Sequence, residues 1–246
     1  MLDGHYIEAI EIIRRLEGGI TRPFLCRANN GKYYVVKGLE LPPVERLAEL
    51  LCARLAASFG LPIAEHGVIH IDQALVRYFP EAKNSLGEGD CFALGYLHNA
   101  SDLVFSQIKQ VPMELQQDVY VFDYWVGNSD RQLTCFGGRP NLMVDGAGTL
   151  SVIDHNQAFQ WPVDVPQFIA NHTFGPANRS WRLDMVSHVE YHQRIKDTAL
   201  QFNELCSDIS EQWREAIGDA ALDKQLRLIE RNLLRYRMDD FWGVLE

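Results

Sequence analysis

The first 80 residues alternate short apolar runs with turn residues. Apolar runs at residues 24–27 and 33–37 flank an Asn-Gly step, a strong signal for a tight turn between antiparallel strands. From Val44 onward, leucine and alanine recur at intervals of three and four, until Gly60-Leu61-Pro62 ends the pattern. This part of the chain therefore predicts a β-hairpin followed by a helix of about four turns.

A change of composition near residue 80 predicts a boundary. A strand-like run at residues 67–78 ends at Phe79-Pro80, and residues 81–90 are polar and contain glycine. We expect a small β-rich part at residues 1–80 and a second, larger part at residues 81–246.

The second part has mainly helical patterns. Residues 92–110 and 113–125 are predicted to be helices, the second beginning after a proline. Two short strands, 141–144 and 149–153, are joined by an Asp-Gly-Ala-Gly turn and predict a second hairpin. From Met185 onward the apolar spacing is mostly helical.

Composition narrows the possible partners. The 246 residues are 47% hydrophobic, enough for one large or two modest domains with a buried core. A net charge of -10 argues against general binding to nucleic acid or anionic membrane, and favours small molecules or proteins. The five cysteines form no C-x-x-C pair, so the sequence predicts neither a disulfide framework nor a zinc site. We find no signal-peptide pattern and no run long enough to span a membrane, and expect a cytoplasmic protein.

Candidate chemistry lies in residues 121–159. Asp130, Asn141 and Asp154 occur there at the ends of short apolar runs. Two carboxylates and an amide suit a divalent cation, although all three could also be turn residues. A hairpin between Asn141 and Asp154 would bring them together, because antiparallel strands return the chain to its starting edge.

The order of the predicted elements, a small β-rich lobe before a larger helical lobe, is the layout of protein kinases and their distant relatives. Phosphoryl transfer needs a carboxylate at the attacking hydroxyl and oxygen ligands that hold magnesium on the phosphates. Asp130 could meet the first need, and Asn141 with Asp154 the second.

Several runs carry a resemblance to a known family. The runs GGITRPFLCRANNGKYYVVKG and ARLAASFGLP, together with DYWVGNSDR, RPNLMVD and LSVIDHNQAF, resemble the HipA-like kinases and, more distantly, type II phosphatidylinositol 4-kinases. The resemblance covers roughly residues 15–160. It implies a two-lobed protein-kinase-like α+β fold that uses ATP and Mg²⁺ and phosphorylates serine or threonine of a protein.

The resemblance also implies roles for individual residues. Lys37 matches the strand lysine that holds the ATP phosphates, and Glu49 matches the helix glutamate that pairs with it. Asp130 matches the catalytic aspartate. Asn141 and Asp154 match the two metal ligands, with Asp154-His155-Asn156 in place of Asp-Phe-Gly.

Other parts of the expected site depart from the family pattern. Gly18 and Gly19 occupy the position of a phosphate-covering loop but lack the three-glycine pattern. The expected hinge beside ATP is the chain edge after Tyr78, at Phe79. Asn141 follows Asp130 by eleven positions, a longer interval than in the familiar catalytic loop.

Alternative functions follow from the same observations. A lipid or small-molecule kinase is a rival within the superfamily, and the long interval after Asp130 motivates a catalytically silent nucleotide-binding or interaction module. Lys37 and Glu49 could instead be solvated, and Asp130 and Asp154 could be turn or capping residues. The expected partners are ATP and a protein substrate, with a regulatory or antitoxin-like protein as a further candidate.

Overall fold

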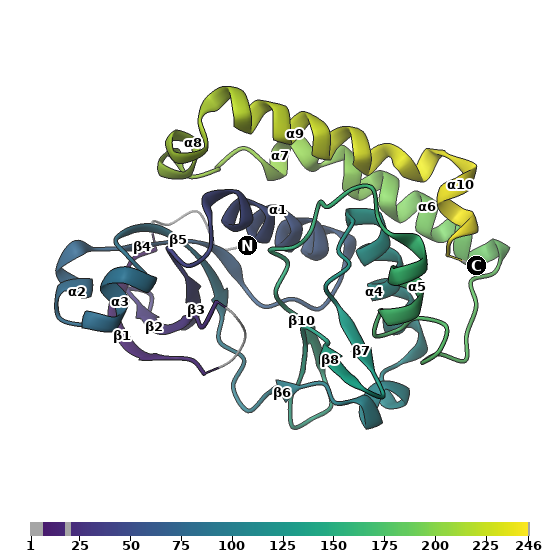
Figure 1. Ribbon diagram of the computed structural model, residues 1–246, viewed down its shortest axis with the longest axis horizontal. Helices are drawn as coiled ribbons and strands as arrows, with labels where there is room; N and C mark the ends of the chain where they lie inside the picture. The colour runs from purple at the N-terminus through teal and green to yellow at the C-terminus, as the bar shows by residue number, and fades with distance from the viewer. Residues whose placement is uncertain (1–6, 18–20, 246) are drawn as a thin grey trace.

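The computed structural model describes residues 7–17 and 21–245, which form a β-rich N-terminal lobe and a helical C-terminal lobe (Figure 1). The α+β class predicted from the sequence is confirmed. The N-terminal lobe is built on an antiparallel sheet in the order β1-β2-β3-β5-β4. Its elements are β1 (Ala9–Arg15), β2 (Phe24–Ala28), β3 (Tyr33–Lys37), α1 (Pro43–Phe59), β4 (His66–Ile71), α2 (Gln73–Arg77), α3 (Pro80–Ser85) and β5 (Gly89–Gly95).

The C-terminal lobe combines two small sheets with helices. One sheet has the order β10-β9-β6, and the other is the hairpin β7-β8. The strands are β6 (Ser101–Asp102), β7 (Gln132–Thr134), β8 (Gly137–Arg139), β9 (Leu142–Val144) and β10 (Leu150–Val152). The helices are α4 (Met113–Val126), α5 (Val165–Asn171), α6 (Met185–Leu200), α7 (Phe202–Leu205), α8 (Glu211–Ile217), α9 (Asp219–Leu233) and α10 (Asp239–Gly243), with 3₁₀ turns at Phe105–Gln110 and Leu234–Arg237.

The predicted hairpin of β2 and β3 is confirmed, with Cys26 opposite Tyr34. Successive residues of a strand point to opposite faces, so neighbouring side chains of β3 contact different parts of the protein. Tyr34 and Val36 are buried in the core of the N-terminal lobe. Val35 and Lys37 lie on the other face, toward the C-terminal lobe.

The predicted helix after Val44 is also confirmed. Helix α1 ends at Gly60, whose φ of 92° is a left-handed conformation that glycine adopts without strain. Leu47, Leu51 and Leu55 pack in the core of the C-terminal lobe. Leu50 packs on a different side of the helix, in a separate cluster that includes residues of β5. Because α1 is apolar on both sides, it joins the two lobes.

The helix expected at residues 92–110 is wrong. Strand β5 occupies the start of this range, and the end is a 3₁₀ turn. Cys91 and Ala93 are buried on one face of β5, while Phe92 and Leu94 are buried on the other. A strand covered on both faces is apolar throughout, so its sequence lacks the alternation that separates a strand from a buried helix.

The strand expected at residues 67–78 also ends earlier than expected. Only His66–Ile71 is a strand, and Asp72 then caps helix α2 by accepting a hydrogen bond from the backbone N–H of Ala74. Strand β5 pairs with both β3 and β4. The expected boundary at residue 80 therefore falls inside the stretch that builds the N-terminal sheet, which continues to Gly95.

The remaining predicted elements are confirmed. Helix α4 begins directly after Pro112, the β9-β10 hairpin forms with Ser151 opposite Met143, and the chain from Met185 is helical. Among the helices of residues 7–17 and 21–245, none combines the length and the apolar character that crossing a lipid bilayer requires.

The C-terminal helices return along α1 and reach the N-terminal lobe (Figure 1). Trp213 of α8 is buried in one cluster with Leu50 and Phe92, and its Nε1 donates to the carbonyl of Asp90 over 2.8 Å. The guanidinium of Arg46 lies 5.6 Å from the Trp213 ring. A single indole thus joins α8 to both α1 and β5.

Replacing Trp213 should weaken the packing of α8 against α1 and β5. We expect Trp213→Ala to lower the free energy of unfolding by about 3–5 kcal/mol, because a large buried ring leaves a cavity. Urea unfolding followed by circular dichroism measures this, with Trp213→Phe as the control that keeps most of the packing but loses the Nε1 hydrogen bond. An unchanged urea midpoint for Trp213→Ala would contradict the docking of α8.

Candidate active site

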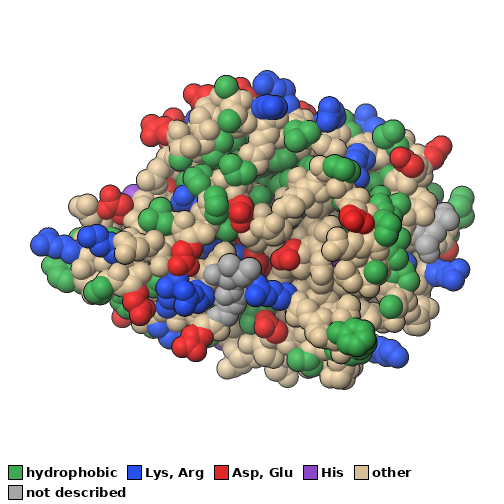
Figure 2. Space-filling view, viewed as in Figure 1, with side chains coloured by type: hydrophobic (Ala, Val, Ile, Leu, Met, Phe, Trp, Pro, Cys, Tyr) green, Lys and Arg blue, Asp and Glu red, His purple; other side chains and the backbone are tan. Residues whose placement is uncertain are grey.

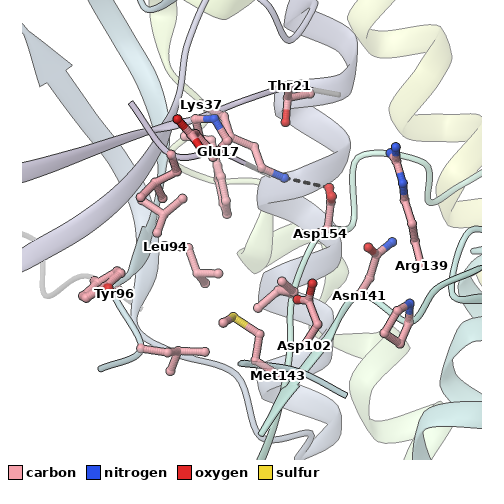
Figure 3. A pocket seen from close by; sticks show the side chains of 18 of the residues that line it. Glu17, Thr21, Lys37, Leu94, Tyr96, Asp102, Arg139, Asn141, Met143 and Asp154 are labelled. Carbon is pink, nitrogen blue, oxygen red and sulfur yellow. Dashed lines mark hydrogen bonds and ion pairs between the residues drawn. The ribbon is translucent and has the colours of Figure 1, made fainter. Parts of the chain in front are cut away.

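A cleft of about 330 Å³ lies between the N-terminal sheet and the β9-β10 hairpin (Figure 3). Charged side chains gather on the face where the two lobes meet (Figure 2). Apolar side chains line one part of the cleft and polar ones the other. The described lining residues are Leu16, Glu17, Thr21, Pro23, Val35, Lys37, Phe92, Leu94, Gly95, Tyr96, Leu97, Asp102, Gly138, Arg139, Pro140, Asn141, Met143, Ile153 and Asp154.

Lys37, the last residue of β3, binds two carboxylates at the polar end of the cleft. Its Nζ lies 2.9 Å from Glu49 Oε2 and 2.7 Å from Asp154 Oδ1. Burial by itself would lower the pKa of Lys37, but Glu49 and Asp154 together raise it above its ordinary value. The ammonium is therefore charged, and it connects β3, α1 and the segment after β10.

Helix α1 also fixes the segment that follows Asp154. Glu49 is buried, and its Oε1 accepts a hydrogen bond of 3.0 Å from the backbone N–H of His155. One turn earlier, Glu45 Oε2 accepts from the side-chain amide of Asn156 over 2.7 Å. Two glutamates on one face of the helix thus hold this segment in place.

His155 is a neutral, packed side chain beside the site. Burial, followed by the nearby charge of Arg131, lowers the pKa of His155 to about 3. Its ring lies edge-on to Phe122, with the centroids 6.5 Å apart. This environment suits a packed histidine rather than a general base.

The β9-β10 hairpin brings Asn141 and Asp154 to the same edge of the cleft. The backbone N–H of Ile153 donates to the carbonyl of Asn141 over 3.1 Å, which closes the hairpin at its base. Both Asn141 and Asp154 have positive φ angles, 47° and 57°. Asn and Asp are the non-glycine residues that tolerate this conformation best, so the backbone at both ends of the hairpin suits these residue types.

Asp130 lies against Asn141. Its Oδ2 accepts a hydrogen bond of 2.9 Å from the side-chain amide of Asn141. Burial, and the nearby charge of Asp154, raise the pKa of Asp130 above its usual value, although the Asn141 hydrogen bond lowers it. Burial would also raise the pKa of Asp154, but Lys37 brings it below its usual value. The two carboxylates are therefore in different electrostatic environments.

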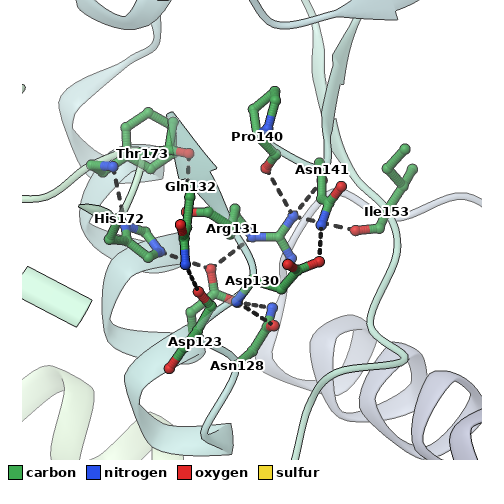
Figure 4. Close-up of polar contacts among 12 residues, drawn as sticks. Asp123, Asn128, Asp130, Arg131, Gln132, Pro140, Asn141, Ile153, His172 and Thr173 are labelled. Carbon is green, nitrogen blue, oxygen red and sulfur yellow. Dashed lines mark hydrogen bonds and ion pairs between the residues drawn. The ribbon is translucent and has the colours of Figure 1, made fainter. Parts of the chain in front are cut away.

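Arg131, next to Asp130, organises the backbone behind these side chains (Figure 4). It is completely buried, and its Nε donates to Asp123 Oδ2 over 2.7 Å. One terminal nitrogen contacts the carbonyls of Asn141 and, at 3.3 Å, Ile153. A single guanidinium thus joins the end of α4 to both ends of the β9-β10 hairpin.

Asp123 is the buried counter-ion of Arg131 and accepts two further hydrogen bonds. Asn128 Nδ2 donates to its Oδ1, and His172 Nε2 lies 2.9 Å from its Oδ2. His172 Nδ1 accepts from the backbone N–H of Phe174, so Nε2 carries the proton and donates to Asp123. Burial would raise the pKa of Asp123, but Arg131 and His172 lower it to about 2.

The structure brings five of the expected site residues together: Lys37, Glu49, Asp130, Asn141 and Asp154. Gly18 and Gly19 lie outside the described residues.

Phe79, the expected hinge residue, does not line the cleft. Phe79 packs edge-on against Phe24 with centroids 6.1 Å apart, beside the core of the N-terminal lobe, and it is not among the described lining residues. The segment from Gly95 to Leu97, which leaves β5, lines the cleft instead.

Sequence reasoning missed the supporting residues. Arg131 is buried and pairs with Asp123, and its position in the sequence next to Asp130 does not reveal this. His172 is 49 residues from Asp123, and no local pattern connects them. Glu45 could have been found, because it precedes Glu49 by one helical turn on a helix that the sequence predicts.

The profile of the HipA-like kinase family matches residues 9–245, nearly the whole chain. The chain belongs to the HipA-like kinase family. As a HipA-like kinase it is a phosphotransferase, and the resemblance noted in its sequence is confirmed.

The solved structures similar to this HipA-like kinase that are described next have low sequence identity to it. The proinflammatory kinase CtkA of Helicobacter pylori is 11% identical, with a TM-score of 0.49 and coverage of 96% of this chain and 100% of that one. A choline/ethanolamine kinase family protein from Mesorhizobium loti is 14% identical, with a TM-score of 0.33 and coverage of 94% of each chain. LicA in complex with AMP is 12% identical, with a TM-score of 0.32 and coverage of 94% and 93%. No curated protein sequence matches the chain.

Removing the negative charge of Asp123 should destabilise the whole C-terminal lobe. Asp123→Asn keeps the side-chain size but leaves the buried Arg131 without its carboxylate, and we expect a loss of about 3–5 kcal/mol in the free energy of unfolding. Chemical denaturation measures this loss. The control is Asp223→Asn on the exposed side of α9, which should change the midpoint little; equal effects of the two changes would contradict the role of Asp123.

Proposed function

We propose that this HipA-like kinase transfers the γ-phosphoryl group of ATP, with Mg²⁺, to a serine or threonine hydroxyl of a protein. One observation carries the proposal. Lys37 is held by Glu49 and Asp154 at the polar end of a cleft whose other end is apolar, and Asp130 lies beside it on Asn141. This arrangement has the parts that phosphoryl transfer needs.

The shape and lining of the cleft suit a nucleotide. Val35, Phe92 and Leu94 from the sheet face Met143 and Ile153 from the hairpin, and flat apolar walls of this kind suit an adenine ring. The segment from Gly95 to Leu97 borders the same region and offers backbone groups for hydrogen bonds to the base. The triphosphate would then extend toward Lys37.

The donor atoms fit magnesium. The side-chain nitrogen of Asn141 donates to Asp130, so the side-chain oxygen of Asn141 is available to a cation. Lys37 binds only Oδ1 of Asp154, so Oδ2 of Asp154 is available as well. Among the described residues no group of three or more His, Cys, Asp or Glu could hold a metal by itself. Mg²⁺ suits such a site, since it usually combines one or two protein oxygens with phosphate oxygens and water. When bound, it would neutralise phosphate charge.

Asp130 would orient the acceptor hydroxyl. The new bond forms between the hydroxyl oxygen and the γ-phosphorus, the bond from that phosphorus to the bridging oxygen breaks, and its electron pair leaves on ADP. The hydroxyl proton passes to the Asp130 carboxylate and then to solvent. The hydrogen bond from Asn141 keeps this carboxylate in place.

A protein acceptor is supported by the surface next to Asp130. The β7-β8 hairpin projects there, and Phe136 at its tip is 97% exposed. An exposed aromatic side chain at the tip of the hairpin that follows Asp130 is a contact that a polypeptide can use and that a small hydroxyl compound does not need.

Nucleotide binding should depend on Lys37. We expect Lys37→Met to weaken Mg·ATP binding by about tenfold or more, because a charged partner of the phosphates is lost while the side-chain volume is kept. Isothermal titration calorimetry measures the affinity, and Lys224→Met on the exposed side of α9 serves as the matched control. Equal affinities in Lys37→Met and the parent would remove Lys37 from the nucleotide site.

Transfer should depend on Asp130 without a matching loss of ATP binding. We expect Asp130→Asn to lower phosphoryl transfer by about two orders of magnitude or more, the size of a general-base contribution. Labelled ATP and Mg²⁺ are incubated with a cell extract, and label is then sought on serine or threonine of proteins. Label on lipids or small molecules would refute the protein acceptor, and ATP binding without any transfer by the parent would identify a silent module.

A further inference from the structure

The long interval between Asp130 and Asn141 is a small β-hairpin. Strands β7 and β8 pair with Gln132 opposite Arg139 and Thr134 opposite Gly137. The chain therefore leaves the catalytic aspartate, turns, and comes back to the cleft immediately before the metal-ligand candidate Asn141. The residues of β8 are exposed, but Gly138 and Arg139 line the cleft.

The hairpin is fixed to the lobe beneath it. Leu133 is buried in the core of the C-terminal lobe, and its carbonyl accepts from Asn178 Nδ2 over 2.8 Å. Gly138 has a φ of 144°, and a Cβ there would lie 2.4 Å from the carbonyl oxygen of Gln132. Only glycine allows the two strands to approach this closely, and that approach sets the position of Arg139.

Arg139 presents its guanidinium at the polar end of the cleft. Figure 3 shows its side chain extending past Asn141 to the level of Asp154. Within residues 7–17 and 21–245, it makes no ion pair and no side-chain hydrogen bond. Burial raises the pKa of Asp130, and Arg139 is close enough for its charge to act in the opposite direction.

The charged side chains that line the cleft, among the residues that the structure describes, show why Arg139 matters. Lys37 and Arg139 are its only cationic side chains, against the carboxylates of Glu17, Asp102 and Asp154. Lys37 is already bound to Glu49 and Asp154, so much of its charge is neutralised within the protein. A triphosphate brings several negative charges into this cleft, and Arg139 is the described lining cation that has no carboxylate partner.

We propose that Arg139 binds the γ-phosphate of ATP and neutralises the charge on its oxygens during transfer. This inference rests on the proposed function, since it names a further group of the same site. Arginine suits the task because its planar fork donates two parallel hydrogen bonds to phosphate oxygens. The inserted hairpin supplies this cation from the side of the cleft opposite Lys37.

A γ-phosphate contact makes a prediction that a general charge effect does not. ATP has the γ-phosphate and ADP lacks it. Arg139→Ala should weaken Mg·ATP binding by about tenfold or more and leave Mg·ADP binding within about twofold of the parent. It should also lower transfer of labelled phosphate to extract proteins by about a hundredfold or more.

The experiment compares the parent with Arg139→Ala, Arg139→Lys and Arg227→Ala by calorimetry with Mg·ATP and Mg·ADP, alongside the transfer assay. Arg227 is exposed on α9, so Arg227→Ala removes one positive charge away from the cleft and should behave like the parent. Arg139→Lys keeps the charge without the fork and should lie between Arg139→Ala and the parent. If thermal melting shows that Arg139→Ala does not fold, Arg139→Lys is compared with the parent in its place.

The outcomes separate the two proposals. A parent that binds neither nucleotide overturns the proposed function itself. If the parent binds ATP and transfers phosphate, unchanged ATP affinity and transfer in Arg139→Ala overturn the role of Arg139. Equal losses of ATP and ADP binding, or a change confined to the KM for the acceptor, also overturn the assignment to the γ-phosphate. Selective loss of ATP affinity together with transfer supports it.

Discussion

The arrangement of the candidate site depends on one buried ion pair, between Arg131 and Asp123. A guanidinium without solvent contact needs a carboxylate and further acceptors, and Nε and one terminal nitrogen of Arg131 find them at the end of α4 and at both ends of the β9-β10 hairpin. Because each of these acceptors is required, the backbone around Asn141 has little freedom. The contacts of Arg131 therefore help to fix the position of the metal-ligand candidates.

The second constraint acts across the cleft. Lys37 belongs to the sheet, Glu49 to α1 and Asp154 to the segment after the hairpin, and their ion pairs bring three distant parts of the chain to one point. Helix α1 makes this possible because it is apolar on two sides and so packs on both lobes. Its glutamates then reach the segment after Asp154, while its leucines fill the cores.

The elements that the sequence predicted well have their signals in neighbouring residues. The Asn-Gly turn between β2 and β3, the spacing of leucines in α1 and the turn between β9 and β10 are local features, and all three elements are confirmed. Strand β5 was missed because it is covered on both faces, which removes the alternation that marks a strand. Because strand β5 was not recognised, the hinge was expected too early in the chain, at Phe79. The segment that leaves β5, beginning at Gly95, borders the cleft instead.

The sequence by itself determined which residues could carry the chemistry: it singled out Lys37, Glu49, Asp130, Asn141 and Asp154 by type, spacing and resemblance. Only the tertiary structure decided what surrounds them. Arg131 differs from a surface arginine only in its burial, and the partnership of His172 with Asp123 spans 49 residues. Burial and long-range pairing arise when distant segments pack together, so no local pattern records them.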